Sequence, residues 1–335
     1  MSGTDSHPPH ARGARAARRR PRPSGTERKR LVRAARMLAR GALVTVVAVA
    51  AVACGSNDTG PIVTVGAGDS PQSRMVAEIY AGALARTGLH TRVQDRVGNR
   101  TDQFAAVDSG EIALFGDVTG DLLTALDSTA TVTKPDAVNA ALAKALPQGV
   151  ATSDPADGTD LRPTIVASAS RPATLPSSLK DLAPHCEDLI VGIDTGAPLD
   201  AQRAPLDPER DVLTPLRTVY HCIVTRTVTF TTEADLRKAL SEGEIHLAVL
   251  SGPPAFLPGD GADLTPLSDP DYAFRAAMIA PILRKSALTD LQLRKLNYVA
   301  GELTTTALAD MVHQIRDQSA IPASVARDWL DAHAL

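Results

Sequence analysis

Short apolar runs that end in glycine or polar residues recur along the chain, and stretches with helical spacing of apolar residues separate them. The short runs predict β-strands at residues 61–68, 90–97, 111–115, 164–170, 189–196 and 280–285. The other stretches predict helices at residues 70–87, 102–108, 233–242, 304–315 and 323–335. Strands that alternate with helices are typical of an α/β protein with a mostly parallel sheet.

The first predicted helix has clear ends and one apolar face. Ser70 suits the N-cap, Pro71 the first helical position and Gly88 the C-terminal stop. The apolar residues recur at helical spacing: Met75, Val76, Ile79, Tyr80, Ala83 and Leu84. We therefore expect the methionine and the tyrosine to belong to the core rather than to a site.

A helix, a Gly-Glu-Ile step, a strand and a small polar turn occur twice in the sequence. The first copy is "TDQFAAVDSGEIALFGD" at residues 101–117, and the second is "EADLRKALSEGEIHLAVLSG" at residues 233–252. The distance between the copies indicates two lobes, which we place at residues 61–160 with 265–335 and at residues 161–264. Ligands of open α/β sheets bind beyond the carboxyl ends of the strands. The polar turns of both copies should therefore face a shared cleft.

Charge divides the chain into two segments. Residues 1–40 hold twelve Arg and Lys against Asp5 and Glu27, a net charge of +10, although the whole chain carries −3. The uncharged run 41–53 follows, and it is shorter than the roughly 20 apolar residues of a membrane-spanning helix. A basic stretch, an apolar run and small residues are typical of a secretory signal, which we predict at residues 1–53. We interpret the arginines at 18–20 as part of this signal, and we expect no nucleic-acid partner.

The end of the apolar run, Ala51-Val52-Ala53-Cys54, resembles a bacterial lipobox. This resemblance implies that Cys54 carries a lipid and becomes the mature N-terminus, with a short polar linker at residues 54–60. The protein would then be exported and anchored to the outer face of the cell membrane. The alternative is ordinary cleavage after Ala53, which would leave Cys54 unmodified.

Composition and cysteine content fit an exported, two-lobed protein. The chain has 335 residues, of which 44% are hydrophobic but only 3% are aromatic. It has 3 Cys, and lipidation of Cys54 leaves Cys186 and Cys222 to form a disulfide worth about 3–4 kcal/mol. His185 and His221 precede these cysteines, but two adjacent pairs of ligands would strain a tetrahedral zinc site. The sequence therefore predicts a disulfide, and no metal or cofactor.

Several motifs, in this order, resemble a known family. They are the strand and capped helix at residues 61–88, "SGEIALFGDVTGDLL", "SSLKDLA", "LRTVY", "PILRK" and the C-terminal "WLDAHAL". Together they look like the glycine betaine/choline/carnitine class of ABC-importer substrate-binding proteins, over about residues 62–335. The resemblance implies a periplasmic-binding-protein-like (type II) fold with two lobes. It also implies a monomeric receptor that closes on a small solute and delivers it to a membrane permease.

The chain differs from this family where family members bind the solute. Family members often have Tyr-Pro-Glu-Tyr-Thr-Gly where this chain has Phe115-Gly116-Asp117-Val118-Thr119-Gly120, and their other cage aromatics fall near Arg162, Leu250 and Ala277. Tyrosine faces attract quaternary ammonium groups by cation–π interaction. Here Arg162 could bind a carboxylate instead, and Asp117 or Asp160 an ammonium group. The equal alternative is that Arg162 and Asp160 pair with each other.

The predicted ligand site consists of strand ends and helix starts, where free backbone N–H groups favour carboxylates. Its candidate residues are Asp69, Ser70, Asn99, Arg100, Thr101, Phe115, Gly116, Asp117, Thr119, Asp160, Arg162, Asp194, Thr195, Ser251 and Gly252. Other aromatic residues that could face the cleft are Phe104, Phe256 and Tyr272.

Two other functions fit parts of the sequence. The first is an anchored interaction protein with a degenerate cleft, because the aromatic cage is missing. The second is a serine hydrolase, because "VTVGAGDS" resembles the Gly-Asp-Ser opening of GDS-type esterases, with Ser70 as nucleophile and Asp310 and His313 as an Asp-x-x-His pair. However, Pro71 replaces the usual Leu, and the Asp310–His313 segment has the pattern of an ordinary amphipathic helix. We therefore expect a binding protein and not an enzyme.

Overall fold

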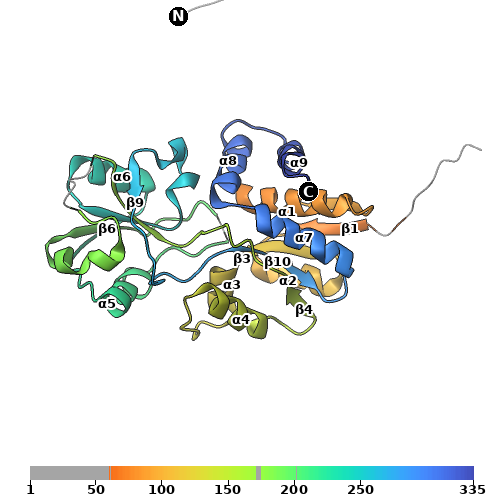
Figure 1. Cartoon of the computed structure of the whole chain (residues 1–335), viewed down its shortest axis with the longest axis horizontal. Coiled ribbons are helices and arrows are strands. Elements are labelled where there is room, and N and C mark those ends of the chain that lie inside the picture. Colours follow the sequence, from red (N-terminus) through yellow and green to blue (C-terminus); the bar gives the residue numbers. More distant parts are fainter. Residues whose placement is uncertain (1–59, 61, 171–174, 201) are drawn as a thin grey trace, which may run out of the picture. The chain divides into compact units, whose positions relative to one another are not determined.

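A computed structural model describes residues 60, 62–170, 175–200 and 202–335 (Figure 1). The predicted signal peptide at residues 1–53 and the predicted lipid-attachment residue Cys54 lie outside the described residues. In the part of the chain that is described, no helix is long and apolar enough to cross a membrane.

Within the described residues, the strands form two five-stranded sheets, sheet A and sheet B. Sheet A has the order β2-β1-β3-β10-β4, formed by β1 Ile62–Gly66, β2 His90–Gln94, β3 Leu114–Val118, β4 Val150–Thr152 and β10 Ile279–Arg284. Sheet B has the order β7-β6-β8-β5-β9, formed by β5 Thr164–Ser168, β6 Ile190–Asp194, β7 Arg226–Phe230, β8 Leu247–Leu250 and β9 Leu264–Pro266. In each sheet one strand, β10 or β5, pairs antiparallel with both neighbours, and the other four run in one direction. The predicted two-lobed α/β fold is confirmed.

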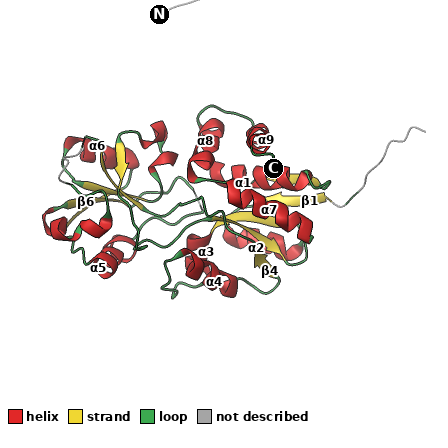
Figure 2. Cartoon of the chain, in the orientation of Figure 1, coloured by secondary structure: helices red, strands yellow, loops and turns green. Residues whose placement is uncertain are grey.

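Helices cover both faces of each sheet (Figures 1 and 2). On one face of sheet A lie α1 Pro71–Ala85, α7 Asp290–Glu302, α8 Thr305–Arg316 and α9 Pro322–Ala332, and on the other lie α2 Arg100–Ser109, α3 Thr119–Leu126 and α4 Pro135–Ala145. Sheet B packs against α5 Thr214–Tyr220 on one face and α6 Glu233–Glu242 on the other. We call sheet A with its helices lobe 1, and sheet B with its helices lobe 2.

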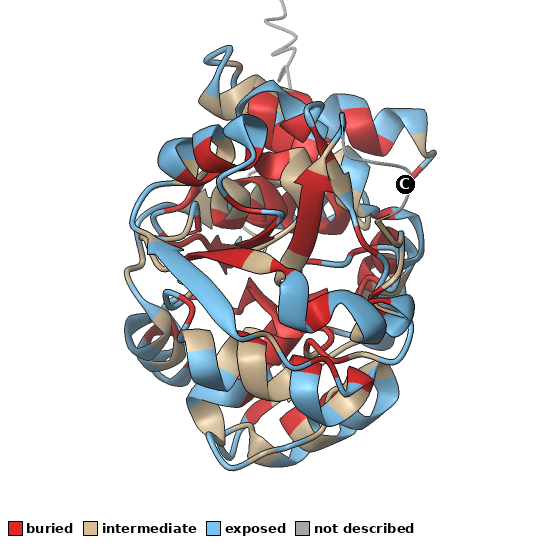
Figure 3. Cartoon of the chain, turned by 90° about the vertical axis from the view of Figure 1, so that its left-hand side faces the viewer, coloured by how far each residue is buried: buried red, intermediate tan, exposed pale blue. Residues whose placement is uncertain are grey.

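The first helix forms as its sequence predicts. Ser70 caps α1, because its Oγ accepts a hydrogen bond from the Ser73 N–H at 3.0 Å, and Pro71 is the first helical residue. Met75 is fully buried and Tyr80 is 3% exposed, so both belong to the core of lobe 1. Figure 3 shows buried residues along many of the strands and on inner helix faces, although β7 is almost wholly exposed.

The repeated Gly-Glu-Ile step has the same conformation in both lobes. Gly110 ends α2 at φ 80°, and Gly243 ends α6 at φ 77°. Glycine favours both positions because this left-handed region is costly for residues with a Cβ. The isoleucine of each step, Ile112 or Ile245, is buried, and the next strand starts two residues after it.

The strand after the first copy lies further along the chain than predicted. The sequence analysis placed a strand at residues 111–115 and a polar turn after it, whereas β3 is Leu114–Val118 and all five of its residues are buried. Residues 110–113 connect α2 to the sheet. Within them, Gly110 has a left-handed conformation and Ile112 is buried, so the strand cannot begin before Leu114. The predicted turn is therefore the strand itself, and α3 begins directly at Thr119.

The predicted boundary between residues 264 and 265 falls inside β9, which pairs with β5 in sheet B. Leu267, Ala273 and Phe274 also pack in the core of lobe 2. The chain therefore returns to lobe 1 several residues later than expected, at the segment that leads into β10.

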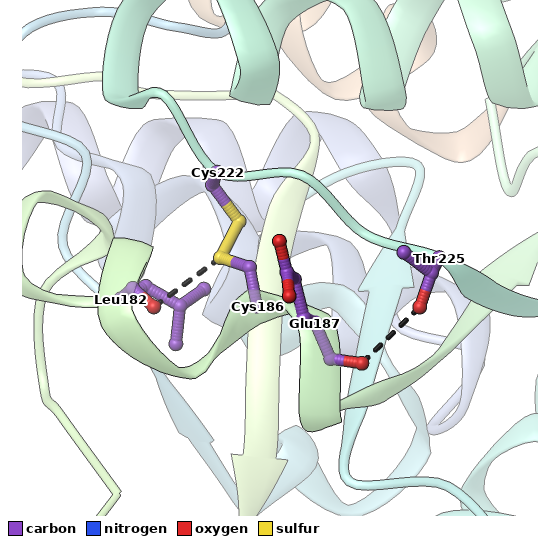
Figure 4. The surroundings of a disulfide bond; sticks show 5 residues. All are labelled: Leu182, Cys186, Glu187, Cys222 and Thr225. Atoms are coloured by element: carbon purple, nitrogen blue, oxygen red, sulfur yellow. Dashed lines mark hydrogen bonds between the residues drawn. A yellow bond between two sulfur atoms is a disulfide. The ribbon is translucent and has the colours of Figure 1, made fainter.

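The predicted disulfide between Cys186 and Cys222 is confirmed (Figure 4). The two Cα atoms are 5.5 Å apart, within the usual range for a disulfide, and the sequence separation is 36 residues. Both cysteines are buried in the core of lobe 2. Cys186 belongs to the segment that precedes β6, and Cys222 to the segment that precedes β7. Thr225 also ties these segments together, because its hydroxyl donates to the Glu187 carbonyl at 3.1 Å.

Candidate functional site

A cavity of about 320 Å³ lies where residues of both lobes meet. Lobe 1 contributes residues at the start of α1 and along α8, namely Pro71, Gln72, Val312 and Arg316. Lobe 2 contributes the ends of β6 and β8, the loop after β6 and the start of α6, including Asp194, Arg203, Glu233, Ser251, Gly252 and Phe256. Such a volume is suited to a small molecule.

Asp194 is the last residue of β6, and its side chain lines the cavity although the residue is only 8% exposed. Its Oδ1 accepts a hydrogen bond from the Gly196 N–H at 3.0 Å. No basic side chain among the described residues forms an ion pair with it. Loss of water around the carboxyl raises the pKa of Asp194, and the Gly196 hydrogen bond opposes this shift.

The loop after β6 connects lobe 2 to lobe 1 beside the cavity. The Arg203 Nε lies 2.8 Å from Oδ2 of Asp121, which is in the first turn of α3. Nearby, the Gln72 amide donates to the Asp200 carboxylate at 2.9 Å. The cavity is therefore closed on this side by polar contacts between the lobes.

Arg162 and Asp160 line a second cavity, of about 510 Å³, and not the first. The Arg162 guanidinium donates to Asp160 at 2.7 Å and to Asp269 at 3.0 Å, and it lies 4.3 Å from the centre of the Tyr272 ring. The alternative in which Arg162 and Asp160 pair with each other is therefore the one that the structure shows. Asp269 and Tyr272 also contact this guanidinium, and Arg162 does not line the first cavity.

The predicted site residues on β3 lie inside lobe 1. Phe115 is fully buried and packs edge-on against Phe104, with the ring centres 5.5 Å apart. A Cβ on Gly116 would stand 2.3 Å from Cγ1 of Val76, so this glycine allows α1 to approach the sheet. The Asp117 carboxylate accepts two hydrogen bonds from Arg100, at 2.7 and 2.8 Å. None of these three β3 residues lines the first cavity.

The remaining predicted residues of lobe 1 have local structural contacts. Thr119 is buried, and its Oγ1 accepts a hydrogen bond from the Met278 N–H at 3.1 Å. Asn99 caps α2 by accepting from the Thr101 N–H at 2.8 Å. Asp69 is exposed, and Ser70 lies directly before the cavity residue Pro71.

In lobe 2, three of the four predicted residues line the first cavity, namely Asp194, Ser251 and Gly252. Thr195 does not line it, and its Oγ1 donates to the Phe230 carbonyl at 3.0 Å. The sequence analysis missed the cavity residues Gln72, Asp200, Arg203, Glu233 and Arg316. The polar stretch 200–203 after the β6 turn was a usable signal, as was the Thr232-Glu233 start of α6.

Ser70 and His313 do not form a nucleophile–base pair. The Ser70 Oγ accepts from the Ser73 N–H, and the residue is 4% exposed. The His313 ring nitrogens instead lie 2.7 Å from Oδ2 of Asp317 and 2.7 Å from the Ala255 carbonyl oxygen. Within the described residues, there is also no group of three or more His, Cys, Asp or Glu side chains that could hold a metal ion.

Two α/β lobes with a small-molecule cavity between them define a periplasmic-binding-protein-like (type II) protein. The chain belongs to the family described as the substrate binding domain of the ABC-type glycine betaine transport system, whose model matches residues 61–332. Substrate-binding proteins of ABC transporters bind small solutes outside the cytoplasm and interact with a membrane permease.

Solved structures have the same fold. A crystal structure titled as a glycine betaine/carnitine/choline ABC transporter is 16% identical, with a TM-score of 0.65, and the match covers 82% of this chain and 98% of that chain. Apo YehZ from Escherichia coli is 18% identical, with a TM-score of 0.64, and the match covers 82% and 99%. The comparison with curated proteins gave no match.

Proposed function

We propose that this protein is the solute receptor of an ABC importer and that it captures a small zwitterionic, osmoprotectant-like solute of the glycine betaine class between its lobes. The observation that carries the proposal is the cavity of about 320 Å³, to which both lobes contribute residues. A solute held there would contact both lobes at once, so binding would stabilise their closed arrangement. A permease can recognise that arrangement.

The walls of the cavity suit a zwitterion better than a neutral solute. The start of α1 faces the cavity at Pro71 and Gln72. Pro71 has no N–H and the Ser73 N–H donates to Ser70, so the Gln72 N–H, at the positive end of the helix dipole, is the backbone group of this turn that favours a carboxylate. Asp194 supplies a negative charge on the opposite lobe. Apolar side chains complete the wall, namely Leu199, Leu250, Phe256, Leu257 and Val312.

The cavity does not contain an aromatic cage. Among the described residues, its lining includes one aromatic side chain, Phe256. Recognition of the cation would therefore depend on a charge as well as on an aromatic face. This difference also supports a second candidate, an anchored interaction protein whose cleft no longer binds a solute.

A lipid on Cys54 would keep the receptor close to its permease, at the outer face of the membrane. The lipobox-like sequence before Cys54 supports this part of the proposal. In cells given a labelled fatty acid, the full chain should incorporate label, and Cys54→Ser should not. Label that persists in Cys54→Ser would contradict the proposed anchor.

Calorimetry on the mature protein separates these functions. Glycine betaine, choline, carnitine, proline and other amino acids are titrated, and hydrolysis of a simple ester is assayed in parallel. Saturable binding of at least one solute, with a stoichiometry near one per chain, supports a receptor with a single site. Binding of none supports the interaction protein, and ester turnover that Ser70→Ala abolishes would reinstate the hydrolase.

A further inference from the structure

The charged residues around the first cavity are not equivalent, because most of them already have a partner. Glu233 forms an ion pair with Arg237 at 3.0 Å, and Asp200 accepts from Gln72. Asp194 forms no ion pair with any described residue, although it is more than nine-tenths buried and faces the cavity. A buried carboxylate without a cation is costly, so this position favours a cationic ligand.

The two guanidinium groups of the cavity differ in the same way. Arg316 uses Nε and Nη2 on Asp317 and donates from Nη1 to the Phe256 carbonyl at 2.7 Å. The Arg203 Nε lies 2.8 Å from the Asp121 Oδ2, and the two terminal nitrogens of Arg203 make no hydrogen bond within the described residues. Gly252 leaves room for them, because a Cβ there would stand 2.9 Å from the Arg203 Nη1. Two free N–H-bearing nitrogens on one guanidinium suit a carboxylate.

Asp194 and Arg203 face one cavity without forming an ion pair with each other. A single solute that neutralises both groups must therefore carry two opposite charges. Within the proposed function, on which this inference rests, we propose that the cavity binds small zwitterions whose ammonium group carries N–H, with Asp194 receiving the ammonium and Arg203 the carboxylate. This narrows the class of solute, because a carboxylate accepts hydrogen bonds that a fully N-methylated ammonium cannot donate.

A methylation series of one scaffold tests this preference. Proline, N-methylproline and N,N-dimethylproline have the same ring and carboxylate, and their ammonium groups carry two, one and no N–H. The apolar wall beside Phe256 suits the ring in all three. We expect the dissociation constant measured by calorimetry to rise at each step, by about tenfold or more over the series.

Variants of Asp194 and Arg203 test whether these two residues cause the preference for ammonium groups that carry N–H. Asp194→Asn should weaken proline binding by roughly 10- to 150-fold and flatten the methylation series. Arg203→Gln should weaken all three zwitterions by a similar factor. Asp188→Asn, which changes an exposed aspartate of the same lobe, should leave every value unchanged. Matching unfolding midpoints would show that the variants fold.

Glycine betaine and choline, titrated in parallel, separate failure of this inference from failure of the receptor assignment. If either binds but N,N-dimethylproline binds more tightly than proline, the receptor stands and the inference is wrong. It is also wrong if Asp194→Asn has no effect on proline binding. If nothing binds, both the inference and the receptor are wrong.

Discussion

The two copies of the helix, Gly-Glu-Ile and strand unit have the same local conformation, but their strands end in different surroundings. In lobe 1, the unit leads into β3, whose residues are all buried and whose Asp117 pairs with Arg100. In lobe 2, it leads into β8, after which Ser251 and Gly252 line the cavity. The local pattern therefore determines the turn and the strand, whereas the neighbouring elements determine whether the strand end faces a ligand.

The comparison is clearest at matching positions. Counting from the left-handed glycine of each copy, Asp117 of β3 corresponds to Leu250 of β8. Leu250 lines the cavity with an apolar side chain, whereas Asp117 is buried and pairs with Arg100. At equivalent positions of the two copies, lobe 2 therefore has an apolar side chain where lobe 1 has a buried ion pair.

The largest effect should come from breaking this ion pair. Arg100→Ala leaves the Asp117 carboxylate buried at 2% exposure with the Val118 N–H but without a cation, which should lower the free energy of unfolding by about 3–5 kcal/mol. Denaturant titration measures the change. Arg100→Met with Asp117→Leu, which copies the leucine of lobe 2, should recover most of the loss. A single variant as stable as the wild type would show that the pair does not support lobe 1.

The disulfide distinguishes the lobes in a second way, because within the described residues it is found in lobe 2 alone. Replacing both cysteines, with Cys186→Ala and Cys222→Ala, should destabilise lobe 2 by about 2–4 kcal/mol. Hydrogen exchange measured by mass spectrometry should then rise in peptides from β6 and β7, and stay unchanged in peptides from β1 and β3. An equal increase in both lobes would mean that the lobes unfold as one unit.

Two glycines at corresponding regions of the copies should respond differently to the same change. Gly116→Ala places a Cβ against Val76 in a packed core, with an expected cost of about 1–3 kcal/mol in unfolding free energy. In Gly252→Ala, the only close approach of the new Cβ is to the flexible end of Arg203, and the Leu161 carbonyl oxygen is at an ordinary contact distance, so stability should change little and solute affinity should fall. Thermal unfolding and calorimetry of both variants check this. The reverse result would place the binding role in lobe 1.

The sequence was sufficient for the class of fold, because the signals that define it are local, but it did not predict the strands β4, β7 and β9 or the helices α3, α4, α5 and α7. Ser70, Pro71 and the glycine stops define helix ends, and the apolar runs define most of the strands within a few residues. The position of β3 was wrong because the pattern does not reveal how many residues the chain needs after Gly110 before it enters the sheet.

The site was harder to predict, because it depends on which charges find partners. Sequence reasoning placed Arg100, Asp117, Asp160 and Arg162 at the ligand, yet each of them pairs inside the protein. These pairings depend on contacts between distant segments, such as that of Arg162 with Asp269. Asp194 was predicted because it ends a strand, and Arg203 was missed because it lies in an irregular loop.

The smallest expected effect is the pH dependence of stability that Asp194 causes. This carboxylate of lobe 2 has no ion-pair partner among the described residues, in contrast to Asp117 of lobe 1. Burial raises the pKa of Asp194 above its ordinary value of 3.8, so the folded state holds this proton more readily than the unfolded state does. Its contribution to stability is therefore greatest in acid and is lost as the pH rises through the pKa of the folded state.

Asp194→Asn removes this titration, so the wild type should lose stability relative to the variant as the pH rises from about 3.8 towards neutrality. The paired carboxylate of Asp117 is present in both proteins, so its titration cancels in the difference. Solute binding should respond in the opposite direction, since protonated Asp194 cannot attract an ammonium group, and affinity should fall on acidification. Paired denaturant titrations and calorimetry over this pH range measure both effects. A stability difference that does not change with pH would show that Asp194 is as well solvated as an ordinary surface aspartate, and its assignment to the cation would lose its physical basis.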